Sequence, residues 1–351
     1  MARIGVNALY LIPGGVGGTE IYLRNLLQAL ADIDRENQYI IFTNRETGDD
    51  LVPDRPNFIY APQPVRASFR PARILWEQLA LPLAASKHRL NVLFNPGFTA
   101  PLLCSCPMVT VFHDLQHKRH PEYFRWFDLP FWNFFVWASA RRSRGAIAVS
   151  QATADDLQRY YHRSAQVIHH GVESELIEIA HRRHPKDYLL CVSTTHPHKN
   201  LERLLRVHAQ MKSAPKLILT GVRGFAAKEI ESLAGEAVEI AGWVPREDLF
   251  RLYRAALGFI YPSTFEGFGM PVLEAMAAGV PVACSDIPAL REIARSTVHF
   301  FDPNSDREIR DALLLLASGK ISTEAAQRRA AQFTWEKTAR ATLDYLSKCS
   351  S

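Results

Sequence analysis

Short apolar runs alternate with helical stretches along the whole chain, and this alternation is the strongest constraint on its fold. In the first half, apolar runs typical of strands fall at residues 4–9, 39–43, 92–94, 108–112 and 146–149. In the second half they fall at 188–193, 216–220, 237–241, 258–261 and 281–284, with helical patterns at 200–211, 246–256, 271–278, 288–294 and 306–317. Continuous apolar strands between helices are typical of parallel sheets covered on both faces. We therefore predict an α/β fold made of two doubly wound units.

The length of 351 residues exceeds what one hydrophobic core usually serves, which also indicates two domains. The segment 173–187 is charged and poor in strand-forming residues, so we place a linker there. The predicted domains are 1–172 and 188–331, followed by a C-terminal amphipathic helix at 332–351. Ligands of open parallel sheets bind beyond the carboxyl ends of the strands, so we expect the two domains to face each other across a binding cleft.

Composition and cysteine content limit the compartment and the partners. Five scattered cysteines without a Cys-x-x-Cys pair favour a reducing cytoplasm over a disulfide framework or a zinc site. No apolar run reaches the roughly 20 residues of a membrane span, and the N-terminus does not resemble a secretory signal. The net charge of +5 mildly favours anionic ligands.

The segment 258–279 predicts a strand, a loop and a helix, and it carries the strongest chemical signal. The strand ends at Tyr261, the loop contains Glu266, and a helix begins near Pro271. Free N–H groups at such a helix start favour a phosphate or another acidic group. Glu274, about one turn into the helix, could accept both hydroxyls of a ribose. Either glutamate alone could equally be a capping residue.

The nine residues EGFGMPVLE, 266–274, resemble the E-x7-E signature of the retaining glycosyltransferases of family 4, and the surrounding YPSTFEGFGMPVLEAMAAGVPVACSD is similar to that family nearly residue for residue. The resemblance implies the GT-B fold, with two Rossmann-like domains facing across a cleft. It implies that domain 1–172 binds the acceptor, that domain 188–331 binds a sugar nucleotide, and that the helix 332–351 crosses back to the first domain.

The resemblance also assigns roles within this segment. Glu266 is expected to contact the donor sugar near the reacting centre, and Glu274 is expected to hold the nucleotide ribose. The backbone amides expected to face the sugar and the phosphates are those of Gly267, Phe268, Gly269 and Met270.

Lys199 lies in a loop between a predicted strand and a predicted helix, where the family has a lysine that binds the diphosphate. A fixed cation there stabilises the departing group. Many members carry an arginine six residues before this lysine or directly before it, but this chain has Ser193 and His198. A protonated His198 or Arg223 could supply the second cation. A solvated loop lysine is the alternative for Lys199.

Three further marks follow the family's order. Gly17 and Gly18 in the Gly-rich turn GGVGGTE would lie against the donor phosphates or the acceptor, unless they form a simple tight turn. His113 ends a predicted strand and could orient the acceptor hydroxyl or contact the donor, or merely cap the next helix. Backbone groups of Trp243 and Val244 would read the nucleobase edge, whereas inter-strand packing is the alternative for Trp243.

No metal site is expected. The spacing of Asp32 and Asp34 resembles a metal-binding Asp-x-Asp motif, but we interpret it as a solvated helix end. His113 and His117 lack a third ligand. We predict a metal-independent enzyme without a cofactor, in which Lys199 and helix dipoles replace the cation.

The segment 122–144 holds three Trp, five Phe and one Tyr beside several arginines. Such aromatic and basic mixtures suit a membrane interface, although the family has a core helix here, so buried packing is the alternative. Arg66, Arg70 and Arg73 form a second basic stretch that could approach anionic lipid headgroups or an acceptor phosphate. We expect a cytoplasmic protein, either free or peripheral on the inner face of the membrane, that does not bind nucleic acid.

The function hypothesis is a retaining hexosyltransferase. It would move mannose from GDP-mannose to a hydroxyl of a glycan or lipid-linked glycan, as in bacterial surface polysaccharide assembly. A sugar-nucleotide 2-epimerase of the same fold and a non-catalytic nucleotide-sugar-binding subunit are the alternatives. A nicotinamide-dependent dehydrogenase is disfavoured because GGVGG breaks the G-x-G-x-x-G spacing.

Overall fold

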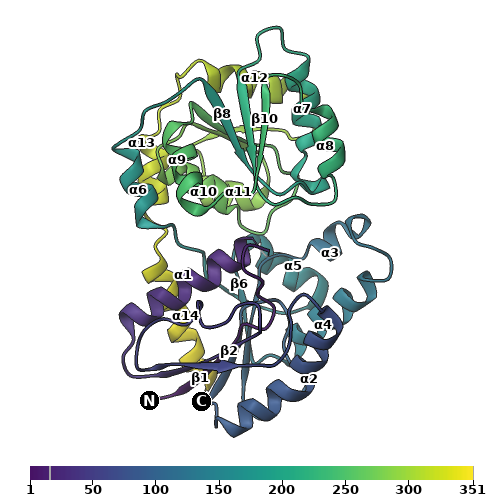
Figure 1. The fold of residues 1–351 in the computed structure, drawn as a ribbon, viewed down its shortest axis with the longest axis vertical. Helices are drawn as coiled ribbons and strands as arrows, with labels where there is room; N and C mark the ends of the chain where they lie inside the picture. Colours follow the sequence, from purple (N-terminus) through teal and green to yellow (C-terminus); the bar gives the residue numbers. More distant parts are fainter. Residues whose placement is uncertain (16, 351) are drawn as a thin grey trace. The chain divides into compact units, whose positions relative to one another are not determined.

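The computed structural model describes residues 1–15 and 17–350, and these residues form two compact units. The first unit comprises Met1–Gly171 together with the C-terminal segment from Trp335, and the second comprises Val172–Thr334 (Figure 1). Each unit holds one parallel sheet with helices packed against it, so the predicted α/β class is confirmed. Among the described residues, no helix combines the length and the apolarity that crossing a bilayer requires.

The sheet of the first unit has the strand order β3-β2-β1-β4-β5-β6-β7. Its strands are β1 (Arg3–Asn7), β2 (Gln38–Thr43), β3 (Phe58–Pro62), β4 (Val92–Asn95), β5 (Met108–Phe112), β6 (Gly145–Ala148) and β7 (Gln166–Val167). Its helices are α1 (Gly18–Ile33), α2 (Arg70–Lys87), α3 (Gln116–Arg119), η1 (Pro121–Tyr123), α4 (Leu129–Arg142), α5 (Gln151–Tyr161) and α14 (Trp335–Ser350).

The sheet of the second unit has the order β10-β9-β8-β11-β12-β13. Its strands are β8 (Tyr188–Val192), β9 (Lys216–Thr220), β10 (Val238–Gly242), β11 (Gly258–Tyr261), β12 (Val282–Ser285) and β13 (His299–Phe301). Its helices are α6 (Ser174–Ala180), η2 (Pro197–Lys199), α7 (Leu201–Ala209), α8 (Ala227–Leu233), α9 (Arg246–Ala255), α10 (Met270–Ala277), α11 (Pro288–Ala294), α12 (Asp306–Ala317) and α13 (Glu324–Ala330).

Both sheets follow the same Rossmann-like winding. Each begins in its middle, at β1 or β8, runs outward to one edge, and then resumes on the other side at β4 or β11. The winding therefore changes direction between β1 and β4 in the first sheet and between β8 and β11 in the second. Such switch points open a crevice at the carboxyl ends of the strands.

All ten apolar runs expected to be strands are strands, with bounds that agree within two residues. Three strands were not predicted, namely β3, β7 and β13. They lie at the sheet edges and contain five, two and three residues. Half-exposed or very short edge strands carry little periodic signal.

The expected linker 173–187 was wrong as a separate segment. It contains α6, which contacts α9 and α10 and buries Leu176 completely, so it belongs to the second unit. The chain instead changes unit between residues 171 and 172 and again between 334 and 335.

The C-terminal helix α14 packs on α1 and lies over β4, β5 and β6 of the first sheet. Its contact face includes Trp335, Ala339 and Leu346, all of which are buried. Gly145, at the start of β6, lets the helix approach closely. A Cβ atom there would meet Cys349 Sγ and Tyr345 Cε1 at 2.8 Å each.

Gly145→Ala should therefore lower stability by about 1–2 kcal/mol, because the added methyl overpacks the contact between β6 and α14. Gly235→Ala is the matched control, since no atom lies within 4 Å of the added methyl there. Thermal unfolding should show a lower melting temperature for the first variant and none of that loss for the second. Equal melting temperatures would contradict the close packing of α14.

Candidate functional site

The E-x7-E residues lie at the carboxyl end of a strand beside the switch point of the second sheet, with Glu266 in the loop between β11 and α10 and Glu274 within α10. Gly269 ends this loop with φ at 102° and precedes Met270, the first residue of α10. A Cβ on Gly269 would meet Leu290 Cδ2 at 2.3 Å, so both the backbone angle and the space require glycine. Pro271 occupies the first turn of α10, where its missing N–H has no cost.

Lys199 and Glu266 meet at this edge of the sheet. Lys199 Nζ lies 2.7 Å from Glu266 Oε1 and 3.3 Å from the hydroxyl of Tyr261. The side chains of Lys199 and Glu266 are only 13% and 10% exposed. Burial and the neighbouring Glu266 raise the pKa of Tyr261 well above its usual value, so its hydroxyl stays protonated. The structure thus joins two predicted site residues that lie 67 positions apart.

The backbone around Lys199 is held in a fixed conformation. Asn200 follows it in the left-handed region, with φ at 56°, and donates from Nδ2 to the carbonyls of Pro262 and Pro303 at 3.1 and 2.8 Å. The carbonyl of His198 accepts from the backbone N–H of Thr264 at 2.8 Å. These bonds connect the loop after β8 to the loop after β11.

Glu274 is 2% exposed and has protein partners on both carboxylate oxygens. Oε1 lies 2.5 Å from Arg246 Nη2, and Oε2 accepts from the hydroxyl of Tyr253 at 3.0 Å. Arg246 also binds Glu173, with Nε 3.0 Å from Oε2. A carboxylate has about four acceptor positions, so these bonds leave capacity for a further donor.

Arg246, Tyr253 and Glu173 are site residues that sequence reasoning missed. Arg246 and Tyr253 are seven positions apart on α9, and therefore lie on one face of that helix. Helix α9 is amphipathic, and polar side chains at positions on its buried, apolar face are a signal that could have identified them. Glu173 gave no such signal, because its partner lies 73 positions away.

The other predicted donor residues of the second unit lie at the same ends of its strands. Ser193 directly follows β8, and its N–H donates to the Thr220 carbonyl at 2.8 Å. Trp243 follows β10 and is 59% exposed, so inter-strand packing does not hold it. Val244 is half-buried beside it.

The two candidates for the second cation, Arg223 and His198, lie in different surroundings. Arg223 is exposed and pairs with Glu231 on α8 at 2.7 Å. His198 is buried, and its ring stacks on that of His196 at 5.9 Å between centroids. Burial and Lys199 lower the pKa of His196, which disfavours a charge on that ring.

His113 belongs to the first unit and follows β5. It is 8% exposed, and its Nε2 lies 2.7 Å from the carbonyl of Pro96. A carbonyl only accepts, so Nε2 carries the proton and Nδ1 presents a lone pair. Burial lowers the pKa of His113 to about 4, and the rings of Tyr22 and His170 lie beside it.

Gly17 and Gly18 also belong to the first unit. Gly17 precedes α1 with φ at 58°, and Gly18 is the first residue of the helix. No atom lies within 4 Å of a Cβ built at either position, so the turn is open there. Val16 of the same turn lies outside the described residues.

The interpretation of residues 32–34 as a solvated helix end is confirmed for Asp32, which is exposed, and wrong for Asp34. Asp34 is 5% exposed and accepts from the Tyr39 hydroxyl at 2.6 Å. Across residues 1–15 and 17–350, no three His, Cys, Asp or Glu side chains gather as metal ligands would. Metal independence stays a prediction.

Arg246→Met should remove the cation between Glu274 and Glu173 and leave two carboxylates together. Removing one partner of a buried pair costs about 3 kcal/mol. Burial already raises the pKa of Glu173, so protonation at pH 5 should relieve part of the loss. Urea unfolding at pH 7 and pH 5 measures both effects. Arg223→Met is the control, because it removes an exposed ion pair and should change the free energy of unfolding by less than about 1 kcal/mol. A similar loss of stability in both variants would contradict the buried ion pairs of Arg246 with Glu274 and Glu173.

His113 should make the folded protein sensitive to acid. Because its folded pKa is about 4 and its unfolded pKa is near 6.5, the stability from neutral His113 is complete above pH 6.5 and falls toward pH 4. Between pH 7.5 and 4.5 this amounts to about 2–3 kcal/mol. His113→Gln should lose that much less stability over the same range. An NMR titration midpoint of the His113 ring near 6.5 would refute the prediction.

Comparison with known proteins indicates a glycosyltransferase in both halves of the chain. The family described as glycosyl transferases group 1 matches residues 173–333, and the family described as glycosyltransferase family 4 matches residues 16–176. O-antigen chain mannosyltransferase B of Escherichia coli is 35% identical over 170 residues, which are 45% of each chain. O-antigen chain mannosyltransferase RfbU of Salmonella typhimurium is 27% identical over 61% of this chain and 62% of its own. The chain thus spans less than two thirds of these curated relatives.

Solved structures match the fold along nearly the whole chain. Sucrose-phosphate synthase from Thermosynechococcus elongatus has a TM-score of 0.78 at 18% identity, with 99% of both chains covered. Anabaena HepE, in complex with UDP and glucose, has a TM-score of 0.75 at 19% identity, with 99% of this chain and 100% of that one covered. With the two family matches together covering residues 16–333, the chain belongs to the family 4 glycosyltransferases, and its two Rossmann-like units are those of the GT-B fold.

Proposed function

We propose that this protein is a retaining mannosyltransferase, which moves mannose from GDP-mannose to a hydroxyl of a glycan or lipid-linked glycan. Several of the curated relatives that it matches are mannosyltransferases, and two of these are named for O-antigen chains, which supports the sugar and the type of acceptor. The observation that carries the proposal is the Lys199–Glu266 pair at the switch point of the second sheet. It brings a cation and a carboxylate together where a sugar diphosphate requires both.

In this proposal Lys199 holds the diphosphate. Its ammonium lies between Glu266 and Tyr261, where an incoming phosphate can share it. The N–H groups from Gly267 to Met270 surround the start of α10 and add the positive end of the helix dipole. Ser193, His198 and Arg223 complete the set around the phosphates. Arg223 could leave its exposed ion pair with Glu231 and bind a phosphate instead, because such a pair contributes little free energy.

Glu274 would bind the ribose diol, and Arg246 and Tyr253 would hold its carboxylate in place for that contact. The backbone of Trp243 and Val244 would frame the base. From the first unit, Gly17 and Gly18 would approach the phosphates or the acceptor. Nδ1 of His113 would accept a hydrogen bond from a sugar or acceptor hydroxyl.

The reaction would proceed on one face of the sugar and without a metal. The bond from the anomeric carbon to the phosphate oxygen breaks, and a bond to the acceptor oxygen forms on the same side. The proton of the acceptor hydroxyl passes to the departing diphosphate oxygen. Glu266 positions the sugar, and Lys199 stabilises the charge that develops on the leaving group.

Lys199→Met should lower the turnover of GDP-mannose hydrolysis and transfer at least tenfold, which is about 1.4 kcal/mol of barrier. Lys216→Met is the matched control, because Lys216 forms an exposed pair with Glu239 in the same unit. Equal rates for the two variants would contradict the role of Lys199.

A thermal-shift assay with a panel of sugar nucleotides tests the identity of the donor. Stabilisation by UDP-glucose but not by GDP-mannose would reject the proposed donor.

A further inference from the structure

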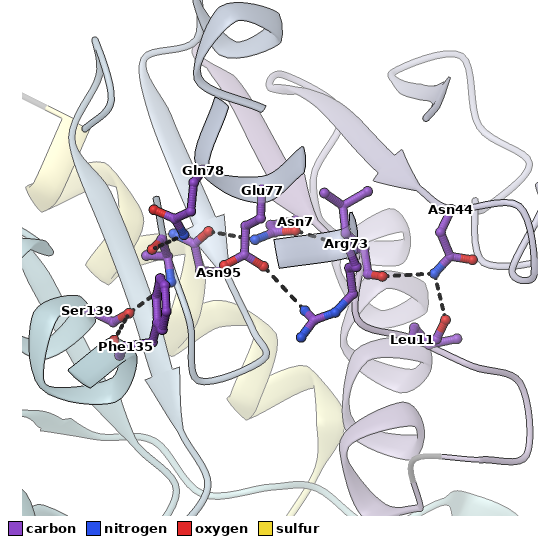
Figure 2. A network of polar contacts seen from close by, with 11 residues as sticks. Asn7, Leu11, Asn44, Arg73, Glu77, Gln78, Asn95, Phe135 and Ser139 are labelled. Carbon is purple, nitrogen blue, oxygen red and sulfur yellow. Dashed lines mark hydrogen bonds and ion pairs between the residues drawn. The ribbon is translucent and has the colours of Figure 1, made fainter. Parts of the chain in front are cut away.

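Helix α2 has charged side chains on its buried face and leucine side chains on its exposed face. Its buried face carries the ion pair of Arg73 and Glu77, 3.4 Å apart, and burial raises the pKa of Glu77 (Figure 2). Its exposed face carries Leu75, Leu79 and Leu83, which recur every four residues and are 60%, 62% and 73% exposed. A row of leucines facing solvent along one helix marks a surface that binds a partner.

Exposed apolar side chains also lie on helix α4 and on the segment before it. Trp126 and Phe127 are 84% and 55% exposed, and Phe134 and Trp137 on α4 are 49% and 43% exposed. The aromatic segment 122–144 is therefore divided. The other face of α4 is buried core, including Val136.

Specific contacts connect the two helices. The Arg70 guanidinium at the start of α2 lies 3.0 Å from Asp128 and 4.5 Å above the ring of Phe131. Gln78 of α2 donates to the carbonyl of Ala100, while the hydroxyl of Ser139 of α4 accepts from the N–H of Ala100 (Figure 2). Both helices therefore hold the same loop. We call their joint exposed surface the apolar face; it comprises Phe69, Leu75, Leu79, Leu83, Trp126, Phe127, Phe134 and Trp137.

The margins of the apolar face carry mostly basic side chains, and the acidic residues beside it, Glu122 and Asp128, pair with His120 and Arg70. Helix α4 contains no acidic residue, and the one acidic residue of α2, Glu77, is buried. Exposed basic side chains flank both helices, namely Arg66, Lys87, Arg89, Arg125, Arg141 and Arg142. Leucine and tryptophan within a basic margin match the boundary between the acyl chains and the anionic headgroups of a bilayer.

We propose that the apolar face docks the protein on an anionic lipid surface. A second copy of the chain is the less suitable occupant, because a two-fold contact would bring two basic margins together. The docking goes beyond the proposed function and does not depend on the identity of the donor.

The docking helices also support the acceptor side of the first unit. The loop that Gln78 and Ser139 hold at Ala100 begins after β4, and its Pro96 carbonyl is the partner of His113. If the proposed function holds, on which this step rests, docking would place the acceptor residue His113 in a unit seated on the lipid that carries the acceptor.

Flotation with vesicles tests the docking. The full chain is mixed either with vesicles of phosphatidylcholine and 30% phosphatidylglycerol or with pure phosphatidylcholine, at roughly 50 and 500 mM salt. We expect at least tenfold stronger binding to the anionic vesicles at low salt, with most of it lost at high salt. Equal binding to both vesicles, or no binding, would overturn the proposal.

Leu79→Glu/Leu83→Glu should reduce binding to the anionic vesicles at least tenfold. Leu314→Glu is the matched control, since Leu314 is 51% exposed on α12 of the second unit, and this variant should bind as the native chain does.

Arg141→Gln/Arg142→Gln should weaken binding to the anionic vesicles about fivefold for each charge removed. Arg328→Gln, exposed on α13, is its control. Losses of the same size in the controls would reject the apolar face.

Two further readouts separate the outcomes. GDP-mannose hydrolysis without vesicles should be unchanged in Leu79→Glu/Leu83→Glu, so that failure of docking and failure of the proposed function give different results. Light scattering measures the oligomeric state. If the native chain is a dimer that these substitutions convert to a monomer, and no vesicle binding is seen, a second copy covers the face and the proposal is wrong.

Discussion

Parallel pairing of the strands is the constraint on which the rest of this molecule depends. Every neighbouring pair recorded in the two sheets is parallel, so the carboxyl ends of all strands within a sheet lie on one edge. Loops that are distant in the sequence therefore converge. Lys199 follows β8 and Glu266 follows β11, and the two meet at 2.7 Å because β8 and β11 are neighbours at the switch point. The winding creates this proximity before any ligand is considered.

The charges at that edge are poor sources of stability. Taking an ammonium and a carboxylate out of water offsets most of their attraction, and a well-packed apolar pair often stabilises a fold as well. The second unit nevertheless keeps Lys199 with Glu266 and Arg246 with Glu274 and Glu173, all largely buried. Buried charges retained at the carboxyl edge of a sheet are best explained by a ligand that is itself charged. The proposed nucleoside diphosphate sugar would be such a ligand.

The first unit shows the opposite arrangement on α2 and α4. Charged Arg73 and Glu77 lie inside, while leucine, phenylalanine and tryptophan side chains face outward. Leaving such side chains in water forgoes the favourable transfer that burial normally provides. An outside partner with an apolar interior and an anionic surface would restore it. The same two helices hold the loop that begins after β4, so the surface proposed to face lipid and the loop proposed to face the acceptor belong to one structural element.

Much of the fold could be predicted from the sequence, because apolar periodicity and helix start signals are local. Ten strands, the α10 helix start and the positions of Lys199, Glu266 and Glu274 follow from residues within a few positions of each other. The edge strands β3, β7 and β13 and the helix α6 were missed, since they are short or polar and gain their order from tertiary packing. Arg246 joins Glu173 and Glu274 across 73 and 28 positions, which no local pattern encodes. Whether Leu75 and Trp126 are exposed also depends on contacts between distant segments, which no local pattern encodes. The sequence by itself determined which residues end strands and begin helices; only the tertiary structure decided which of their side chains meet and which face outward, because burial and ion pairing arise between distant segments.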